Sequence, residues 1–170
     1  MAWWGGVFLT AAAVLAISGV AKLGSPQATQ RALRASRLPS SRLAVSCLAV
    51  AEVALAAAAV ATGSWTAATA VAVIYLAYAV FVATARYRGG PETNCGCFGK
   101  GETPPTLLHI VINLVFAAAA GLAATQPTGG LPALVARSPG QAGLLAGYAV
   151  LGGWLTYLVL DVLPSMRAVR

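Results

Sequence analysis

Two cysteines separated by one glycine, Cys95 and Cys97, stand in the polar stretch "NCGCFGKGETPP" between two long apolar runs. Thiols exchange with disulfides, and a C-x-C pair closes a small, strained ring when it is oxidised. Gly96 favours that ring because glycine adopts backbone angles that other residues resist. Strained, accessible disulfides are typically catalytic rather than structural, so the spacing favours redox-active thiols. An inert disulfide is one alternative.

A metal site is the other alternative for this pair. Cys95, Cys97, Cys47 and His109 together would supply four ligands, which is enough for zinc, but a C-x-C pair alone is a weak zinc signature. Cys47 is a lone cysteine in an apolar run, and such cysteines more often contribute to packing than to catalysis. Its place near the start of that run also makes it a candidate resolving thiol.

Glu52 is a carboxylate inside the same apolar run, five residues after Cys47 and so roughly 7–8 Å further along a helix. A carboxylate within a membrane span is costly unless it is paired or protonated. Lys22, which ends the preceding apolar run, is the natural partner. A structural ion pair and a proton-handling role are both open for these two residues.

His109 and Asn113 lie four residues apart at the start of a later apolar run and therefore share one face of a helix. Headgroup contact and interhelical hydrogen bonding compete with catalysis as their roles. His109 would stabilise a thiolate if it lay near the cysteine pair. These polar residues are candidate site members because the chain has so few others.

The surrounding elements must be membrane helices. The chain has 170 residues, of which 59% are hydrophobic and 9% charged, too little charge to cover the surface of a soluble domain. Apolar runs of about 20 residues cross the hydrocarbon as helices. We expect an all-α integral membrane protein, a bundle of four to five transmembrane helices with short loops. One domain over 1–170 would hold spans at about 3–21, 43–61, 67–85, 106–124 and 140–160.

The connections between the spans are polar or rich in Pro and Gly. The stretch Gln27–Leu38 could form a short amphipathic helix on the membrane surface. A Pro/Gly-rich connection follows the fourth span, and the fifth contains Gly143 and Gly147 in a small-xxx-small arrangement that permits close helix packing. Asp161, at the end of that span, is expected to be an interfacial residue.

The basic residues predict the orientation. With the N-terminus outside and five spans, ten of the eleven Lys and Arg residues fall on the inner side and only Arg137 falls outside. The positive-inside rule favours this arrangement, with an inside C-terminus in the inner or plasma membrane. A four-span alternative would lose part of the asymmetry. The net charge of +7 thus indicates topology, and no basic face with interleaved aromatics suggests nucleic-acid binding.

Four features together resemble the MauE family of small membrane proteins, which is related to the DoxX/DoxD-like group. They are "GVAK" (Gly19 to Lys22) ending the first span, Glu52 in the second, "CGCFG" (Cys95 to Gly99) after the third and Asn113 in the fourth. The resemblance covers the chain to about residue 125, and "CGCFG" is its most specific element. Family members often carry Arg before the Asn, where this chain reads "LLHIVIN".

The resemblance implies a membrane component of thiol–disulfide handling. The family is associated with processing or maturation of the disulfide-rich small subunit of methylamine dehydrogenase, alongside a thioredoxin-like partner. The expected partners are therefore a thioredoxin-like protein or an exported disulfide-containing substrate, besides the lipid bilayer. Cys95 and Cys97 would form the redox pair. The charge count places this pair inside, whereas an exported protein matures outside. Either the pair passes electrons across the membrane as a relay, or the loop that carries it faces outward.

The sequence leaves open whether the chain is an enzyme; the candidate activity is that of a thiol–disulfide oxidoreductase. The competing class is a non-enzymatic assembly factor, or a metal-binding membrane protein, with structural cysteines. A small transporter is disfavoured because the sequence has no internal repeat and no pair of broken helices. No cofactor is expected, with zinc and quinone left as alternatives.

Overall fold

The computed structural model describes residues 4–88, 105–126 and 129–162, and these residues form helices without any strand. The elements are α1 (Trp4–Gly24), α2 (Gln27–Ala35), α3 (Arg42–Thr62), α4 (Trp65–Arg88), α5 (Leu107–Thr125), α6 (Gly130–Arg137), α7 (Pro139–Tyr157) and the π-helical turn η1 (Leu158–Val162). The expected all-α class is confirmed.

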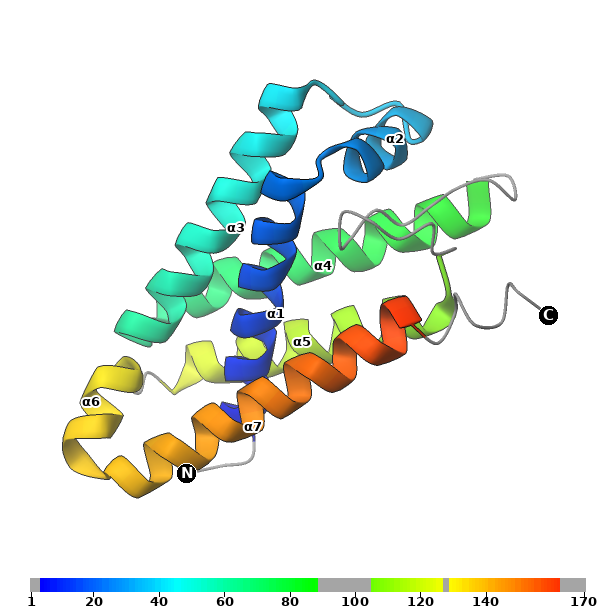
Figure 1. The fold of residues 1–170 in the computed structure, drawn as a ribbon. Helices are drawn as coiled ribbons and strands as arrows, with labels where there is room; N and C mark the ends of the chain where they lie inside the picture. Colours follow the sequence, from blue (N-terminus) through cyan, green and yellow to red (C-terminus); the bar gives the residue numbers. More distant parts are fainter. Residues whose placement is uncertain (1–3, 89–104, 127–128, 163–170) are drawn as a thin grey trace.

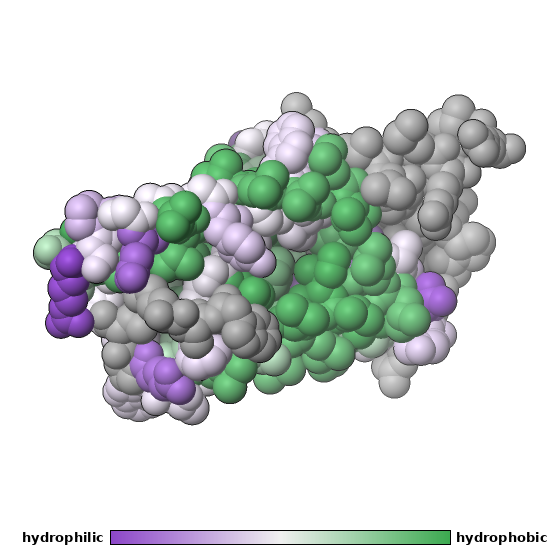
Figure 2. All heavy atoms as spheres, turned by 90° about the horizontal axis from the view of Figure 1, so that it is seen from below, coloured by the Kyte–Doolittle hydropathy of each residue, from purple (hydrophilic) through white to green (hydrophobic). Residues whose placement is uncertain are grey.

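Five of these helices, α1, α3, α4, α5 and α7, are long and apolar enough to cross a membrane. They begin and end within a few residues of the predicted spans. Figure 2 shows hydrophobic side chains covering a broad area of the face seen from below, with hydrophilic residues beyond it at the left end. A surface of this kind suits hydrocarbon rather than water, so the protein is a multi-pass membrane protein.

Successive spanning helices run in alternating directions, which gives the bundle two distinct ends (Figure 1). One end, here called the Lys22 end, holds the last turn of α1, all of α2, the start of α3, the last turn of α4, the start of α5 and η1. The opposite end holds Trp4, the turn between α3 and α4, and α6. The candidate site residues that the structure describes lie toward the Lys22 end: Lys22, Cys47, Glu52, His109 and Asn113.

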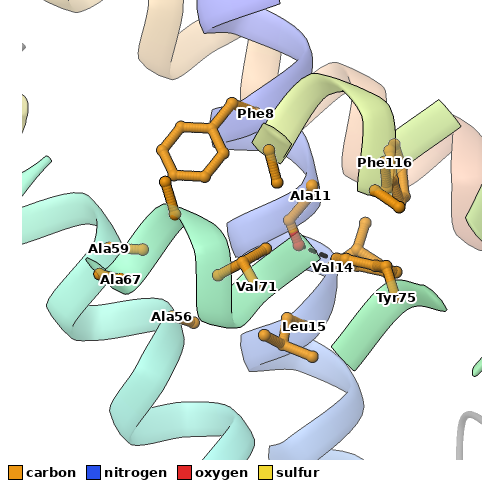
Figure 3. Packing of buried hydrophobic residues seen from close by; sticks show 13 residues of the cluster. Phe8, Ala11, Val14, Leu15, Ala56, Ala59, Ala67, Val71, Tyr75 and Phe116 are labelled. Atoms are coloured by element: carbon orange, nitrogen blue, oxygen red, sulfur yellow. Dashed lines mark hydrogen bonds between the residues drawn. The ribbon is translucent and has the colours of Figure 1, made fainter. Parts of the chain in front are cut away.

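Helix α1 is the central element of the bundle. It packs along α3, α7 and α5, while α4 and α5 form the most extensive helix pair. The core where they meet is rich in alanine, which lets the helices approach closely (Figure 3). There the Tyr75 hydroxyl of α4 donates a hydrogen bond of 2.6 Å to the carbonyl of Ala11 in α1, and the Tyr75 ring lies edge-on to Phe116 of α5. One tyrosine thus joins three spanning helices.

The sequence signals at the two ends of α3 explain where it begins and stops. The Ser41 side chain accepts a hydrogen bond from the Ala44 amide at 3.1 Å, as an N-cap residue does. Gly63 closes the helix in the left-handed conformation, with φ 54°, which glycine adopts without steric cost. The chain then turns directly into α4.

The helix α6 is where the structure departs from the expected connection after the fourth span. It has only eight residues and follows a left-handed Gly129, so its pattern was too short to predict a helix. Pro132 is tolerated because it stands in the first turn. Gly130 fits closely against α3, since a Cβ there would lie 2.3 Å from the carbonyl oxygen of Ala61. The expected helix within Gln27–Leu38 is present as α2, and the structure does not test its contact with a membrane surface.

Candidate functional site

A buried ion pair between α1 and α3 is the centre of the candidate site. The Lys22 ammonium lies 2.9 Å from both carboxylate oxygens of Glu52. Lys22 is 3% exposed and Glu52 is fully buried. Charges at such a depth persist when each has its counter-ion. The predicted pairing is confirmed.

Two further side chains complete the cluster, and sequence reasoning missed both. The Lys22 ammonium also donates to the Ser18 hydroxyl, one turn earlier in α1. The Tyr78 hydroxyl of α4 donates to Oε1 of Glu52, and the ammonium lies 5.5 Å from the centre of the Tyr78 ring. The i, i+4 spacing of Ser18 and Lys22 could have revealed the first. Nothing in the pattern of α4 distinguishes Tyr78 from its other aromatics.

The close approach of α1 and α3 beside this pair depends on Gly19. A Cβ at Gly19 would lie 2.7 Å from the carbonyl oxygen of Ala49 and 2.7 Å from a methyl carbon of Val53. Real side-chain carbons do not come that close to backbone oxygen, so only glycine fits. The "GVAK" motif therefore has a physical reason: the glycine lets Glu52 reach the lysine one turn later.

His109 and Asn113 lie on one face of α5, as their spacing predicted, and this face is buried in the bundle. His109 is 2% exposed and Asn113 is 9% exposed. Nδ1 of His109 accepts a hydrogen bond from the Thr106 amide at 3.4 Å and lies 2.8 Å from the Thr106 hydroxyl, in a capping box that starts α5. Because Nδ1 acts as an acceptor, neutral His109 carries its proton on Nε2. The amide of Asn113 donates to the His109 carbonyl at 2.7 Å.

A cavity of about 250 Å³ joins these residues. Most of its wall is apolar and comes from α1, α2, α4, α5 and Leu160 of η1. Its polar lining residues are Ser18, Lys22, Thr29, Tyr75, Tyr78, His109 and Asn113. The structure thus brings Lys22, His109 and Asn113 together around one space at the Lys22 end, with Glu52 behind the lysine.

Cys47 does not join this cluster. It is an exposed, free thiol on α3, and five residues of helix place it about 140° around the axis from Glu52. It therefore faces outward while Glu52 faces α1. Its role as a resolving thiol stays a prediction.

Cys95 and Cys97 lie outside the described residues. The chain on either side of them is described: Arg86, near the end of α4, donates to the carbonyl of Pro105 at 3.4 Å. The described residues that flank the cysteine segment therefore meet at the Lys22 end. Among residues 4–88, 105–126 and 129–162, no three His, Cys, Asp or Glu side chains gather as metal ligands would. Asp161 lies in η1, which follows α7.

Comparison with known proteins gives one family and one curated relative. The family model described as "Methylamine utilisation protein MauE" matches residues 1–126. A protein of Paracoccus denitrificans named "Methylamine utilization protein MauE" is 37% identical over 107 residues, which cover 61% of this chain and 54% of that protein. The chain thus aligns with about half the length of that relative. No solved structure matches.

Proposed function

Since this chain belongs to the MauE family, whose model matches residues 1–126, we propose that it handles thiol–disulfide exchange for an exported, disulfide-containing protein. The small subunit of methylamine dehydrogenase is the leading candidate for that substrate, because the similar Paracoccus denitrificans protein is named for methylamine utilisation. A thioredoxin-like protein would be the second partner. The inner or plasma membrane is the proposed location.

One observation carries this proposal: the buried polar cluster and the chain ends flanking the cysteine pair lie at the same end of the bundle. Lys22, Glu52 and His109 are held at this end by a salt bridge and hydrogen bonds. Buried charge in a membrane protein is a functional-site signal because it is costly to keep. The opposite end, among the residues described, has no comparable buried cluster.

The chemistry would be disulfide exchange. The thiolate of Cys95 or Cys97 attacks one sulfur of a partner disulfide, which forms a mixed disulfide and releases the partner's other sulfur as a thiolate. The second cysteine of the pair then attacks the mixed disulfide. The partner leaves with two thiols, and the pair becomes a disulfide. The reverse sequence would oxidise the partner.

Trapping of the mixed disulfide tests the proposal. Removal of the resolving thiol leaves the first thiol bound to its partner, so Cys95→Ser or Cys97→Ser should accumulate a covalent complex that reductant releases. Cells would be quenched with acid, alkylated, and analysed on non-reducing gels followed by mass spectrometry. The matched control is Cys47→Ser, which keeps the pair intact.

The outcomes separate exchange from an assembly role. A reductant-sensitive complex in one of the two single variants, and its absence in Cys95→Ser/Cys97→Ser, supports exchange. Normal maturation of the exported partner in that double variant would contradict it and favour a non-enzymatic assembly factor. Maleimides that do or do not cross the membrane, applied before and after mild reduction, would show whether the pair is oxidised and which side it faces.

A further inference from the structure

The cavity beside Lys22 has a shape and lining that suit a specific kind of ligand. We propose that it binds the ring of a lipid-soluble quinone. This inference rests on the proposed function in its oxidising direction, in which the pair takes two electrons from a partner dithiol, becomes a dithiol itself and must pass those electrons to an acceptor. The cavity's size, charge and opening favour this class of acceptor.

The volume accommodates one substituted six-membered ring. An apolar cavity of roughly 150 Å³ is enough to bind benzene, and this cavity has about 250 Å³. The surplus fits the oxygens and small substituents of a quinone. Aromatic side chains of Tyr75, Phe81 and Phe116 stand in the wall, and flat rings pack favourably against such side chains.

The charge balance favours a neutral ligand over an anionic one. Lys22 is the cation in the cavity wall, and both carboxylate oxygens of Glu52 lie 2.9 Å from its ammonium. The pair is neutral overall, so a phosphate or fatty-acid carboxylate would have to compete with Glu52 for the lysine. A quinone is uncharged, and its carbonyl oxygens need only hydrogen-bond donors.

Donors for its carbonyl oxygens are present in the wall. The side-chain nitrogen of Asn113 carries two hydrogens, of which one reaches the His109 carbonyl at 2.7 Å. Because Asn113 lines the cavity, its second hydrogen can serve a ligand oxygen. Lys22 and Tyr78 also line the cavity.

The cavity also offers a path for a long tail. Ala77 lines it and is exposed, and this residue lies near the middle of α4 (Trp65–Arg88). At that depth the exposed face of α4 meets hydrocarbon, so we expect the cavity to open there. An isoprenoid tail can therefore remain in the lipid while the ring occupies the protein.

The redox step balances without another reactant. Two thiols form one sulfur–sulfur bond and release two electrons and two protons. The quinone takes up both electrons and both protons, and its two carbonyl oxygens become the hydroxyls of a quinol. The thiols are those of the proposed function, and the cavity supplies the acceptor.

Binding can be measured with ubiquinone-1, a short-tailed quinone, by equilibrium dialysis against the full chain in lipid nanodiscs, with empty nanodiscs as background. The cavity is filled by Ile112→Trp. Its matched control is Val111→Trp, because Val111 is the preceding residue of α5 but is exposed and does not line the cavity. We expect saturable binding that weakens about tenfold or more in Ile112→Trp and stays within about twofold in Val111→Trp. Leu33→Trp fills the same cavity from α2 if the first variant does not fold.

Absence of saturable ubiquinone-1 binding, or equal affinity in the filled and control variants, would overturn the inference. So would saturable binding of oleate or phospholipid that ubiquinone-1 cannot displace. The double variant Cys95→Ser/Cys97→Ser separates this inference from the proposed function. It should bind ubiquinone-1 like the unaltered chain but lose reduction of the quinone, which is followed by ultraviolet absorbance. Binding without thiol-dependent reduction in the unaltered chain would overturn the redox step proposed here, whereas the trapped mixed disulfide tests exchange with the partner independently.

Discussion

At the scale of single residues, the pair Lys22 and Glu52 decides the character of the site. Both are almost fully buried, and their charges are balanced at 2.9 Å. Burial of two charges costs several kcal/mol per ion, which their attraction offsets only when the geometry is good. The pair is therefore better explained by function or by specific helix pairing than by stability alone.

Removal of one partner should destabilise the protein more than removal of both. Lys22→Met leaves an unpaired buried carboxylate, and Glu52→Gln leaves an unpaired ammonium. We expect each to lower the free energy of unfolding by about 3–5 kcal/mol, and Lys22→Met/Glu52→Leu to recover most of that loss. Thermal unfolding in detergent, followed by size-exclusion chromatography, measures the difference. A double variant as unstable as the worse single variant would contradict this account.

Tyr78→Phe should affect the same pair more mildly. The change removes the hydroxyl that donates to Glu52 but keeps the ring beside Lys22. Hydrogen bonds to charged groups contribute about 1.5–3 kcal/mol, so we expect a loss of that size in chemical unfolding experiments. The control is Tyr148→Phe on α7, where the side chain is 55% exposed. Equal effects in the two variants would show that the Tyr78 hydroxyl does not support the site.

At the scale of elements, the contact between α1 and α3 sets the site's geometry. Helix backbones approach closely where small residues face one another. Gly19 supplies that contact one turn before Lys22, and Ala49 faces it from α3. The helix pair and the ion pair therefore depend on each other.

Gly19→Ala tests this dependence with one added carbon. The new Cβ would meet backbone oxygen at 2.7 Å, so α1 and α3 must move apart. Overpacking of this kind costs about 1–3 kcal/mol, and we expect a lower thermal midpoint in detergent. Gly121→Ala in α5 is the matched control, because a Cβ there meets nothing within 4 Å. A neutral Gly19→Ala would mean that the helices have more room than the structure shows.

At the scale of the whole molecule, the alternating helices and the basic residues together predict an orientation. Exposed arginines lie at the Lys22 end, in α2, at the start of α3 and near the end of α4, whereas Arg137 ends α6 at the opposite end. The positive-inside rule then predicts that the Lys22 end faces the cytoplasm.

A reporter fused after Arg170 tests that orientation. We expect activity from a reporter that works only in the cytoplasm, and none from alkaline phosphatase, which requires export. Fusions after Thr62, at the opposite end, should give the reverse pattern. Alkaline phosphatase activity after Arg170 would overturn the orientation and place the cysteine segment outside.

Much of the fold and part of the site were predictable from the sequence. Apolar runs of about 20 residues have one stable solution in lipid, the helix, because every backbone polar group must be satisfied within the segment. The same scarcity of polar residues made Lys22, Glu52, His109 and Asn113 visible as candidates. Helix α6 was missed because a short segment with glycine and proline carries no clear periodicity.

By itself, the sequence determined the class of the protein, its spans and the pairing of Lys22 with Glu52. Hydropathy is a local property of each segment, and a buried charge has few possible counter-ions in a chain with so few charged residues. Only the tertiary structure decided that Ser18 and Tyr78 join that pair, that Cys47 faces away, and that a cavity connects Lys22 to Asn113. These features depend on how the helices rotate and approach one another. That geometry follows from packing among many small side chains, so it cannot be predicted from any single residue type.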